Sequence, residues 1–93
     1  MTYELAFLDA ALKEWRKLDA PTAAQFKKKL IERLENPKIP SACLHGSKER
    51  YKIQLRQAGF RLVYEVRDHA LLVLVVAVGK RDRNEVYKVA DRR

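Results

Sequence analysis

Alternating apolar and polar side chains at residues 51–67, YKIQLRQAGFRLVYEVR, constrain the fold more than any other part of the chain. Apolar side chains occupy every second position on both sides of a Gln-Ala-Gly segment, which is typical of two antiparallel strands with one buried face. Directly opposed residues share a face of a sheet, so odd positions of one strand must pair with even positions of the other. The predicted pairs are Leu55 with Phe60, Ile53 with Leu62, and Tyr51 with Tyr64.

The same rule gathers the polar side chains of the hairpin on the opposite side of the sheet. This second set consists of Lys52, Gln54, Arg56, Arg61, Val63 and Glu65. Three of these side chains are cations and one is an anion. Strand geometry alone therefore predicts a cationic surface on this side.

Two helices are predicted before the hairpin, after a short strand at residues 3–7. We expect Asp9 to cap the first helix, and Thr22 with Gln25 to form a capping box that opens the second. The segment NPKIP at residues 36–40 ends the second helix, because a residue before proline avoids helical backbone. The apolar positions at helical spacing are Leu8, Ala11, Leu12, Trp15 and Leu18 in the first helix, and Ala23, Phe26, Leu30 and Leu34 in the second.

The run LLVLVVAV at residues 71–78 lacks alternation, which is typical of a central strand covered on both faces. A central strand needs a neighbour on each side. The hairpin strand that ends at Arg67 supplies one neighbour, and the strand at residues 3–7 supplies the other. We therefore predict an α+β fold with a small antiparallel or mixed four-stranded sheet and the two N-terminal helices packed on one of its faces.

The segment KRDRNEVYKVADRR at residues 80–93 is predicted to form a C-terminal helix. Asp82 or Asn84 can cap this helix, and its apolar side consists of Val86, Val89 and Ala90. No repeat, linker or low-complexity segment interrupts the chain. We expect a single domain spanning residues 1–93.

The charge of the chain favours a polyanionic partner. The sequence holds 20 Lys and Arg against 12 Asp and Glu, a net charge of +8. Residues 48–93 contain 12 basic and 6 acidic side chains, whereas residues 1–47 contain 8 and 6. An excess of this sign favours nucleic acid, and the alternative is a charge that serves only solubility.

Several classes of protein are excluded by composition. The single cysteine, Cys43, cannot form an intrachain disulfide or build a cysteine zinc site. The longest apolar run, ALLVLVVAV, has nine residues against the ~20 that a membrane span needs. The first residues lack the basic and apolar regions of an export signal. We therefore expect a cytoplasmic protein that is neither exported nor inserted into a membrane.

The cations of the sheet can converge on a phosphate group. Lys52 and Arg61 belong to the polar face of the hairpin, and Lys80 and Arg81 follow the central strand. Tyr87 lies about 100° around the last helix from its apolar stripe, where its hydroxyl can overhang the same place. RNA cleavage without metal needs a base for the 2′-hydroxyl, cations for the phosphoryl oxygens, and an acid for the departing 5′-oxygen.

Histidine is the usual acid and base, but the two histidines here are badly placed for a shared site. His45 lies in a predicted loop and His69 in a predicted turn. A dense group of cations can replace them, because it lowers the pKa of a lysine or tyrosine toward neutrality. The alternative is structural: Arg61 pairs with Glu65 or a helix carboxylate, and Tyr87 only caps the core.

Four segments of the chain carry a family resemblance. ALKEWRKL, KKKL, YKIQLRQAGFRLVYEV and VGKRDRNEVY resemble the RelE toxins of bacterial toxin–antitoxin pairs, in one register over nearly the whole chain. The resemblance implies a RelE-like microbial ribonuclease fold and a toxin that cleaves messenger RNA in the ribosomal A site by 2′-hydroxyl attack, without metal or other cofactor. It also implies that the toxin alone is monomeric, and that a RelB-like antitoxin neutralises it and carries it to operator DNA.

The resemblance also implies which residues act. The catalytic positions of the family correspond to Lys52, Arg61, Arg81 and Tyr87. We expect contacts with messenger RNA or the ribosome, including 30S ribosomal RNA, from Gln54, His45, Arg56, Lys80, Arg83, Lys27 and Lys28. For the lysines of residues 27–29, a solvated helix face is the alternative.

Two positions depart from the family. Gln54 stands where RelE toxins usually have a second lysine, and a glutamine cannot serve as a cationic acid. His45 stands where an arginine is common. The departures predict a weaker or differently tuned nuclease.

Two other functions remain open. A ParE-like toxin on the same scaffold would inhibit DNA gyrase without cleaving RNA, and a plain basic binding module would not stop growth. The presence of Lys52, Arg61, Arg81 and Tyr87 favours the nuclease.

Overall fold

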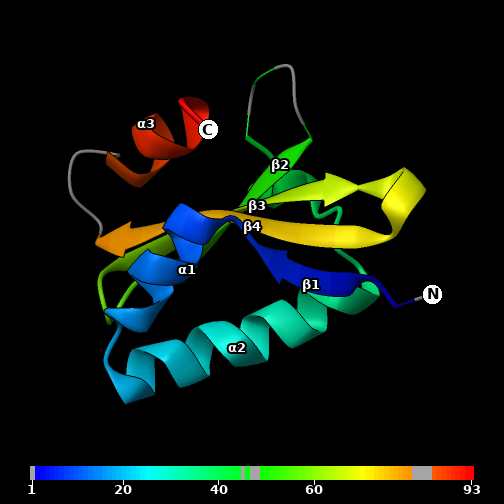
Figure 1. Ribbon diagram of the computed structural model, residues 1–93. Coiled ribbons are helices and arrows are strands. Elements are labelled where there is room, and N and C mark those ends of the chain that lie inside the picture. Colours follow the sequence, from blue (N-terminus) through cyan, green and yellow to red (C-terminus); the bar gives the residue numbers. More distant parts are fainter. Residues whose placement is uncertain (1, 45, 47–48, 81–84) are drawn as a thin grey trace.

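Four strands form one mixed sheet with the order β1-β4-β3-β2 (Figure 1). The structure is a computed structural model that describes residues 2–44, 46, 49–80 and 85–93. The elements in chain order are β1 (Glu4–Phe7), α1 (Asp9–Arg16), α2 (Ala20–Glu35), β2 (Arg50–Leu55), β3 (Phe60–Arg67), β4 (Leu72–Lys80) and α3 (Glu85–Asp91). Short 3-10 turns lie at Pro40–Ala42 and Asp68–Ala70.

The predicted strand arrangement is confirmed. β4 lies in the centre between β1, which runs parallel to it, and β3, which runs antiparallel. The hairpin has the predicted register, with Leu55 opposite Phe60, Ile53 opposite Leu62, and Tyr51 opposite Tyr64.

One face of the sheet packs on α1 and α2 and holds the larger core. Trp15 lies between Phe7 and Phe26, with ring centroids 5.3 and 6.2 Å away. The buried members of this core are Ala11, Phe26, Leu30, Tyr51, Ile53, Leu55, Leu62, Tyr64, Val66, Val73, Val75 and Val78. The odd-numbered residues of β2 and the even-numbered residues of β3 therefore face the helices, as their alternation predicts.

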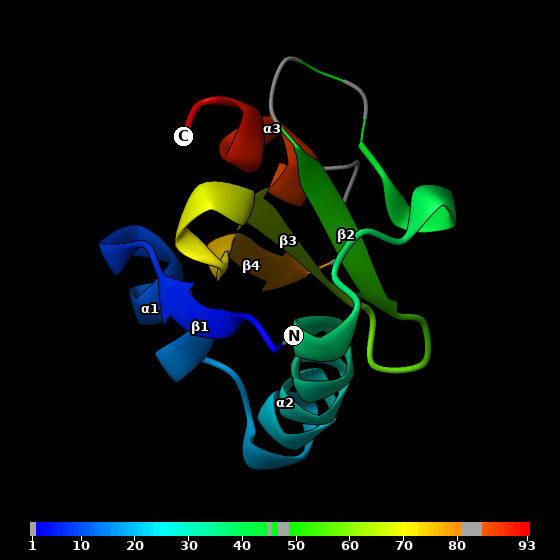
Figure 2. The ribbon, with the colours of Figure 1, turned by 90° about the vertical axis from the view of Figure 1, so that its right-hand side faces the viewer.

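The opposite face is covered in part by α3, which lies across the sheet from α2 (Figures 1 and 2). Val63, Val76 and Ala77 of the sheet pack there against Val86 and Ala90 of the helix, and all five are buried. The second side of the hairpin was expected to be a polar surface. This is wrong for the part that holds Val63 and Glu65, which are both buried. The apolar stripe of the helix needs an apolar seat, and Val63 is part of it.

A β-bulge interrupts the pairing of β4 with β3. The register with β3 shifts between Val63, which lies opposite Ala77, and Tyr64, which lies opposite Val75. Val76 is the extra residue, and it joins Ala77 in the core beneath α3. An extra residue in one strand reverses the facing of every side chain beyond it, so the end of β4 has the opposite parity from its beginning.

Both helix starts differ from the sequence prediction. Asp9 is the first residue of α1, and the cap position is Leu8, whose side chain makes no capping bond. Asp19 caps α2 instead of Thr22, because its carboxylate accepts from the Thr22 backbone N–H at 3.2 Å and the Thr22 hydroxyl at 2.7 Å. These two bonds lower the pKa of Asp19. Pro21 follows within the first turn, where a proline is tolerated.

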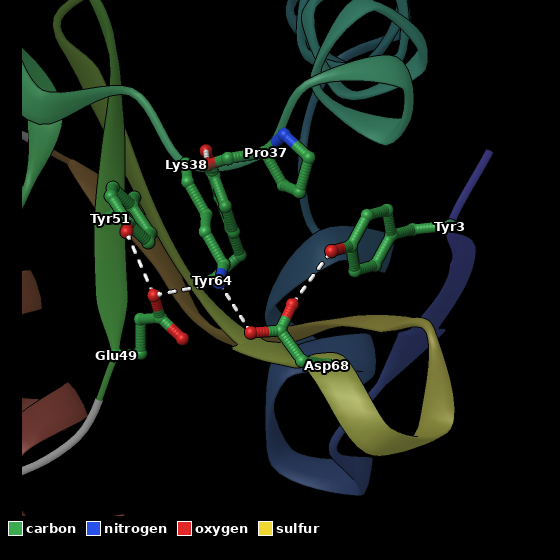
Figure 3. A network of polar contacts seen from close by, with 7 residues as sticks. All are labelled: Tyr3, Pro37, Lys38, Glu49, Tyr51, Tyr64 and Asp68. Carbon is green, nitrogen blue, oxygen red and sulfur yellow. Dashed lines mark hydrogen bonds and ion pairs between the residues drawn. The ribbon is translucent and has the colours of Figure 1, made fainter. Parts of the chain in front are cut away.

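A polar network joins four chain segments at the end of the sheet where β1 and β2 begin and β3 ends (Figure 3). Lys38, after α2, contacts both Asp68, after β3, and Glu49, before β2. Tyr3 donates to Asp68 at 2.7 Å, and Tyr51 donates to Glu49 at 3.3 Å. Bonding with Lys38 and Tyr3 lowers the pKa of Asp68, and bonding with Asp68 raises the pKa of Lys38. The network ties the loops that flank the hairpin to β1.

No helix among the described residues is long and apolar enough to cross a membrane.

The network predicts a pH dependence of stability that Lys38→Met should weaken. The lowered pKa of Asp68 means that its contribution exists above its ordinary value of 3.8 and is lost as pH falls through the folded-state value. The raised pKa of Lys38 means that its contribution exists below 10.5 and is lost at higher pH. The difference between wild type and Lys38→Met in free energy of unfolding should therefore be largest near about pH 5–9 and shrink at both extremes. Urea denaturation at a series of pH values measures this difference. A difference that stays constant from about pH 3 to neutrality would contradict the prediction.

Candidate functional site

Gln54 and Arg61 form the centre of the candidate site, because they lie directly opposite each other on β2 and β3. Their shared face is the one that α3 partly covers. From α3, Tyr87 meets both: the Gln54 amide donates to its hydroxyl at 3.0 Å, and the Arg61 guanidinium carbon lies 5.0 Å from the centre of its ring. Three residues that the sequence analysis singled out are therefore in contact.

The contacts fix the chemistry available at Tyr87. The face of an aromatic ring attracts a cation, so Arg61 favours this position of the ring. The phenol oxygen accepts a hydrogen bond from Gln54, which leaves its own proton free to be donated elsewhere. Tyr87, Gln54 and Arg61 are all half-buried, so a ligand can reach them while water is partly displaced.

A pocket of about 260 Å³ opens beside this contact. It is lined by Gln54, Leu55, Arg56, Phe60 and Arg61. Pockets for drug-sized ligands usually measure about 300–1,000 Å³, so this one suits a single small group such as a base or a phosphate. The two arginines in its wall favour an anion.

Lys52 lies on the same face, two residues before Gln54 and opposite Val63. Two residues of strand span about 6.6 Å, so Lys52 and Gln54 stand next to each other along the edge of the sheet. Lys52 is half-buried, and its carbonyl oxygen accepts from Arg33 at 3.4 Å. Lys52, Arg56 and Arg61 are therefore the cations nearest to Gln54 on or beside this part of the face.

One predicted member of the cationic face is misplaced. Lys80 lies opposite Phe60, on the side of the sheet that packs against α1 and α2, whereas Arg61 lies opposite Gly79 on the other side. The bulge at Val76 is the reason, because it reverses the parity of the last residues of β4. The side chain of Lys80 is exposed at the strand end.

The other predicted site residues are spread over the chain. Arg56 is exposed in the turn after β2, and Lys27 and Lys28 are exposed on α2, across the sheet from Tyr87. Phe60 packs against the larger core, as expected. His69 is exposed in the turn after β3. Arg81, Arg83 and His45, together with the predicted caps Asp82 and Asn84, lie outside the described residues.

The buried pair of Arg50 and Glu65 was not predicted. The Arg50 guanidinium lies 3.1 Å from the Glu65 carboxylate, which Arg67 also contacts at 2.7 Å. Burial raises the pKa of Glu65, but hydrogen bonds from Arg67 and Arg50 outweigh it and leave the pKa below its ordinary value. The signal was available, because the register that pairs Tyr51 with Tyr64 also pairs Arg50 with Glu65.

Within the described ranges, no group of three or more His, Cys, Asp or Glu side chains is arranged to hold a metal ion. The side chains that meet at the site are cations, one phenol and one amide.

Comparison with known proteins gives close matches. Residues 5–85 match the family described as the ParE toxin of the type II toxin-antitoxin system parDE. The chain is 52% identical over 93 residues to the mRNA interferase toxin RelE of Escherichia coli strain K12, covering 100% of this chain and 98% of that relative. Among solved structures, the free R81A/R83A mutant of Escherichia coli toxin RelE matches with a TM-score of 0.92 and 49% identity, covering 100% of this chain and 98% of that one. The toxin in the intact Escherichia coli RelBE toxin-antitoxin complex matches with a TM-score of 0.83 and 51% identity, covering 87% and 99%.

The bond between Gln54 and Tyr87 can be tested by a double-mutant cycle. Tyr87→Phe removes the hydroxyl and leaves the ring on Arg61, so we expect the free energy of unfolding to fall by about 0.5–1.5 kcal/mol. Gln54→Ala should cause a similar loss. The double variant should lose less than the sum, because both changes remove the same bond. Urea denaturation followed by circular dichroism measures all four proteins, and strictly additive losses would show that the two side chains do not interact.

Proposed function

Because this chain belongs to the RelE toxins of the RelE/ParE superfamily in type II toxin–antitoxin systems, we propose that it is an endoribonuclease that cleaves messenger RNA and is neutralised by a RelB-like antitoxin. The observation that carries this proposal is the contact of Tyr87 with both Gln54 and Arg61 beside a pocket that suits a base or a phosphate. The site is built from cations and a phenol, which suits phosphodiester chemistry.

The reaction needs no group beyond the side chains and the RNA itself. The 2′-oxygen attacks the neighbouring phosphorus, its proton passes to a base, and the bond to the 5′-oxygen breaks as that oxygen takes a proton. The products are a 2′,3′-cyclic phosphate and a 5′-hydroxyl. Lys52 or Tyr87 serves as the base, while Arg61 and Arg81 neutralise the charge that builds on the phosphoryl oxygens and assist the leaving oxygen.

Gln54 tunes this site through Tyr87. A lysine at this position would donate to the phenol oxygen as a cation, whereas the glutamine amide donates as a neutral group. A charged donor stabilises a tyrosinate more strongly than a neutral one does. The neutral glutamine therefore stabilises the tyrosinate, the form that can accept a proton, less than a lysine would.

The proposed place of action is the A site of the 30S subunit, in the cytoplasm, where the toxin enters as a monomer and a single domain. Lys27 and Lys28 extend the positive surface across α2, and Arg56 extends it at the rim of the pocket. Lys80, Arg83 and His45 are the remaining contacts that we propose for ribosomal RNA or message. Operator DNA is bound only through the complex with the antitoxin.

A ParE-like inhibitor of DNA gyrase is the second candidate, because the matching family is described by ParE. Such an inhibitor needs no constellation of Lys52, Arg61 and Tyr87 on one face. The 52% identity to an mRNA interferase over the whole chain also favours the nuclease.

Mapping of message ends tests the proposal directly. Purified protein added to programmed ribosomes should cut the message within the A-site codon and leave a cyclic phosphate and a 5′-hydroxyl. Arg61→Ala should slow the cut by about 10²–10³, because one charge-stabilising donor is lost. Intact messages, with relaxed plasmid DNA accumulating when gyrase is assayed, would overturn the nuclease in favour of the gyrase inhibitor.

Gln54→Lys should increase the rate of cleavage, because the cationic donor favours the charged form of the phenol. The measurement is single-turnover cleavage on ribosomes with the toxin in excess. Gln57→Lys, which adds the same charge in the exposed turn after β2, is the matched control and should change the rate little. Equal rates for wild type and Gln54→Lys would count against the proposed role of Gln54.

A further inference from the structure

Tyr87 lies on α3, a helix that is too short to be stable by itself. α3 has seven residues, whereas isolated helices shorter than about 12–15 residues are marginal in water. Val86 and Ala90 are its buried residues. Other contacts must therefore hold the helix on the sheet.

A buried arginine holds the last turn of α3 from one side. Arg50, at the start of β2, donates through its guanidinium to the backbone carbonyl of Ala90. Glu65 keeps this guanidinium in place, because its carboxylate lies 3.1 Å from the Arg50 Nε. The Ala90 carbonyl also accepts from the Arg93 backbone N–H at 3.0 Å, and because the last carbonyls of a helix carry partial negative charge, a cation is well suited to them.

A second arginine, Arg93, holds the chain just beyond α3 against β4 and α1. Arg93 donates to the carbonyl of Val76 at 2.9 Å and to the Glu14 carboxylate at 2.8 Å. The same carboxylate accepts from the backbone N–H of Val78 at 3.2 Å. β1 ends at Phe7, opposite Val75, so Arg93 and Glu14 bond to the part of β4 that β1 does not reach.

We propose that Arg50 and Arg93 are positioning residues that hold α3 so that Tyr87 stays against Gln54 and Arg61. Tyr87 lies three residues before Ala90, about one helical turn from the Arg50 bond. Arg50 joins the helix end to β2 and β3, whereas Arg93 joins the chain after it to β4 and α1, so together they fix both the place and the direction of the helix. The effect on cleavage rests on the function proposed above, whereas the effect on the helix does not.

Amide hydrogen exchange tests the effect on the helix. In Arg93→Ala and Glu14→Gln, the amides of Val86–Ala90 should exchange about tenfold faster or more, with little change in β3. Arg92→Ala is the matched control, because Arg92 is exposed and its side chain bonds to none of the described residues. It removes the same charge and should leave the exchange unchanged. Unchanged exchange in Arg93→Ala would overturn the proposal.

The buried pair needs a variant that leaves no unpaired charge. Arg50→Met combined with Glu65→Gln removes the bond to Ala90 and both members of the ion pair, so the sheet should still fold. Faster exchange confined to α3 is the expected result. Exchange at the wild-type rate would show that Arg50 does not hold the helix.

Cleavage on ribosomes tests whether the arginines act through Tyr87. Arg93→Ala should lower the maximal rate by up to about 10², with the half-saturating concentration unchanged. Combined with Tyr87→Ala, it should lower the rate no further than Tyr87→Ala alone, because the residue to be positioned is gone. Additive losses would show that Arg93 does not act through Tyr87. If the wild type cuts no message, the proposed function fails, and the exchange rates still decide whether the arginines hold α3.

Discussion

The register of β2 on β3 is the constraint on which the site depends. It places Gln54 opposite Arg61 and directs both toward α3, while Ile53 and Leu62 face the helices on the other side. A slip of one residue would exchange the two faces, burying cations and exposing the core. The hydrophobic effect therefore fixes the register, and the arrangement of the site follows from it.

The sequence was sufficient for the hairpin and the strand order, because alternation with a period of two is directly visible in residues 51–67. It also placed Lys52 and Arg61 on one face. It misjudged how open that face is, since α3 covers Val63 and Glu65 through tertiary contacts that no local pattern encodes. The position of Tyr87 over this face was expected, but its bond to Gln54 depends on how α3 packs on the sheet and was not predicted.

Lys80 shows a different limit of sequence analysis. It was expected near Arg61 because it comes at the end of the central strand, and an unbroken β4 would have placed it on that face. The extra residue at Val76 reversed the parity. A run made only of Leu, Val and Ala does not indicate which face each residue occupies. The bulge is seen only in the structure, where β4 contributes to the cores on both faces of the sheet. The capping prediction for α2 failed because both Asp19 and Thr22 are suitable cap residues, and in the structure Asp19 accepts the bonds from Thr22.

The bonds of Glu14 and Arg93 to the uncovered part of β4 also bear on solubility. The strand LVLVVAVGK is rich in β-branched residues and low in charge, which is the composition of segments that stack into fibrils. An exposed strand edge with open backbone groups invites another chain to pair with it. Here the carbonyl of Val76 and the N–H of Val78 are already taken by side chains. The sheet is thereby closed to extension at the place where its most aggregation-prone strand would otherwise be offered to a neighbouring molecule.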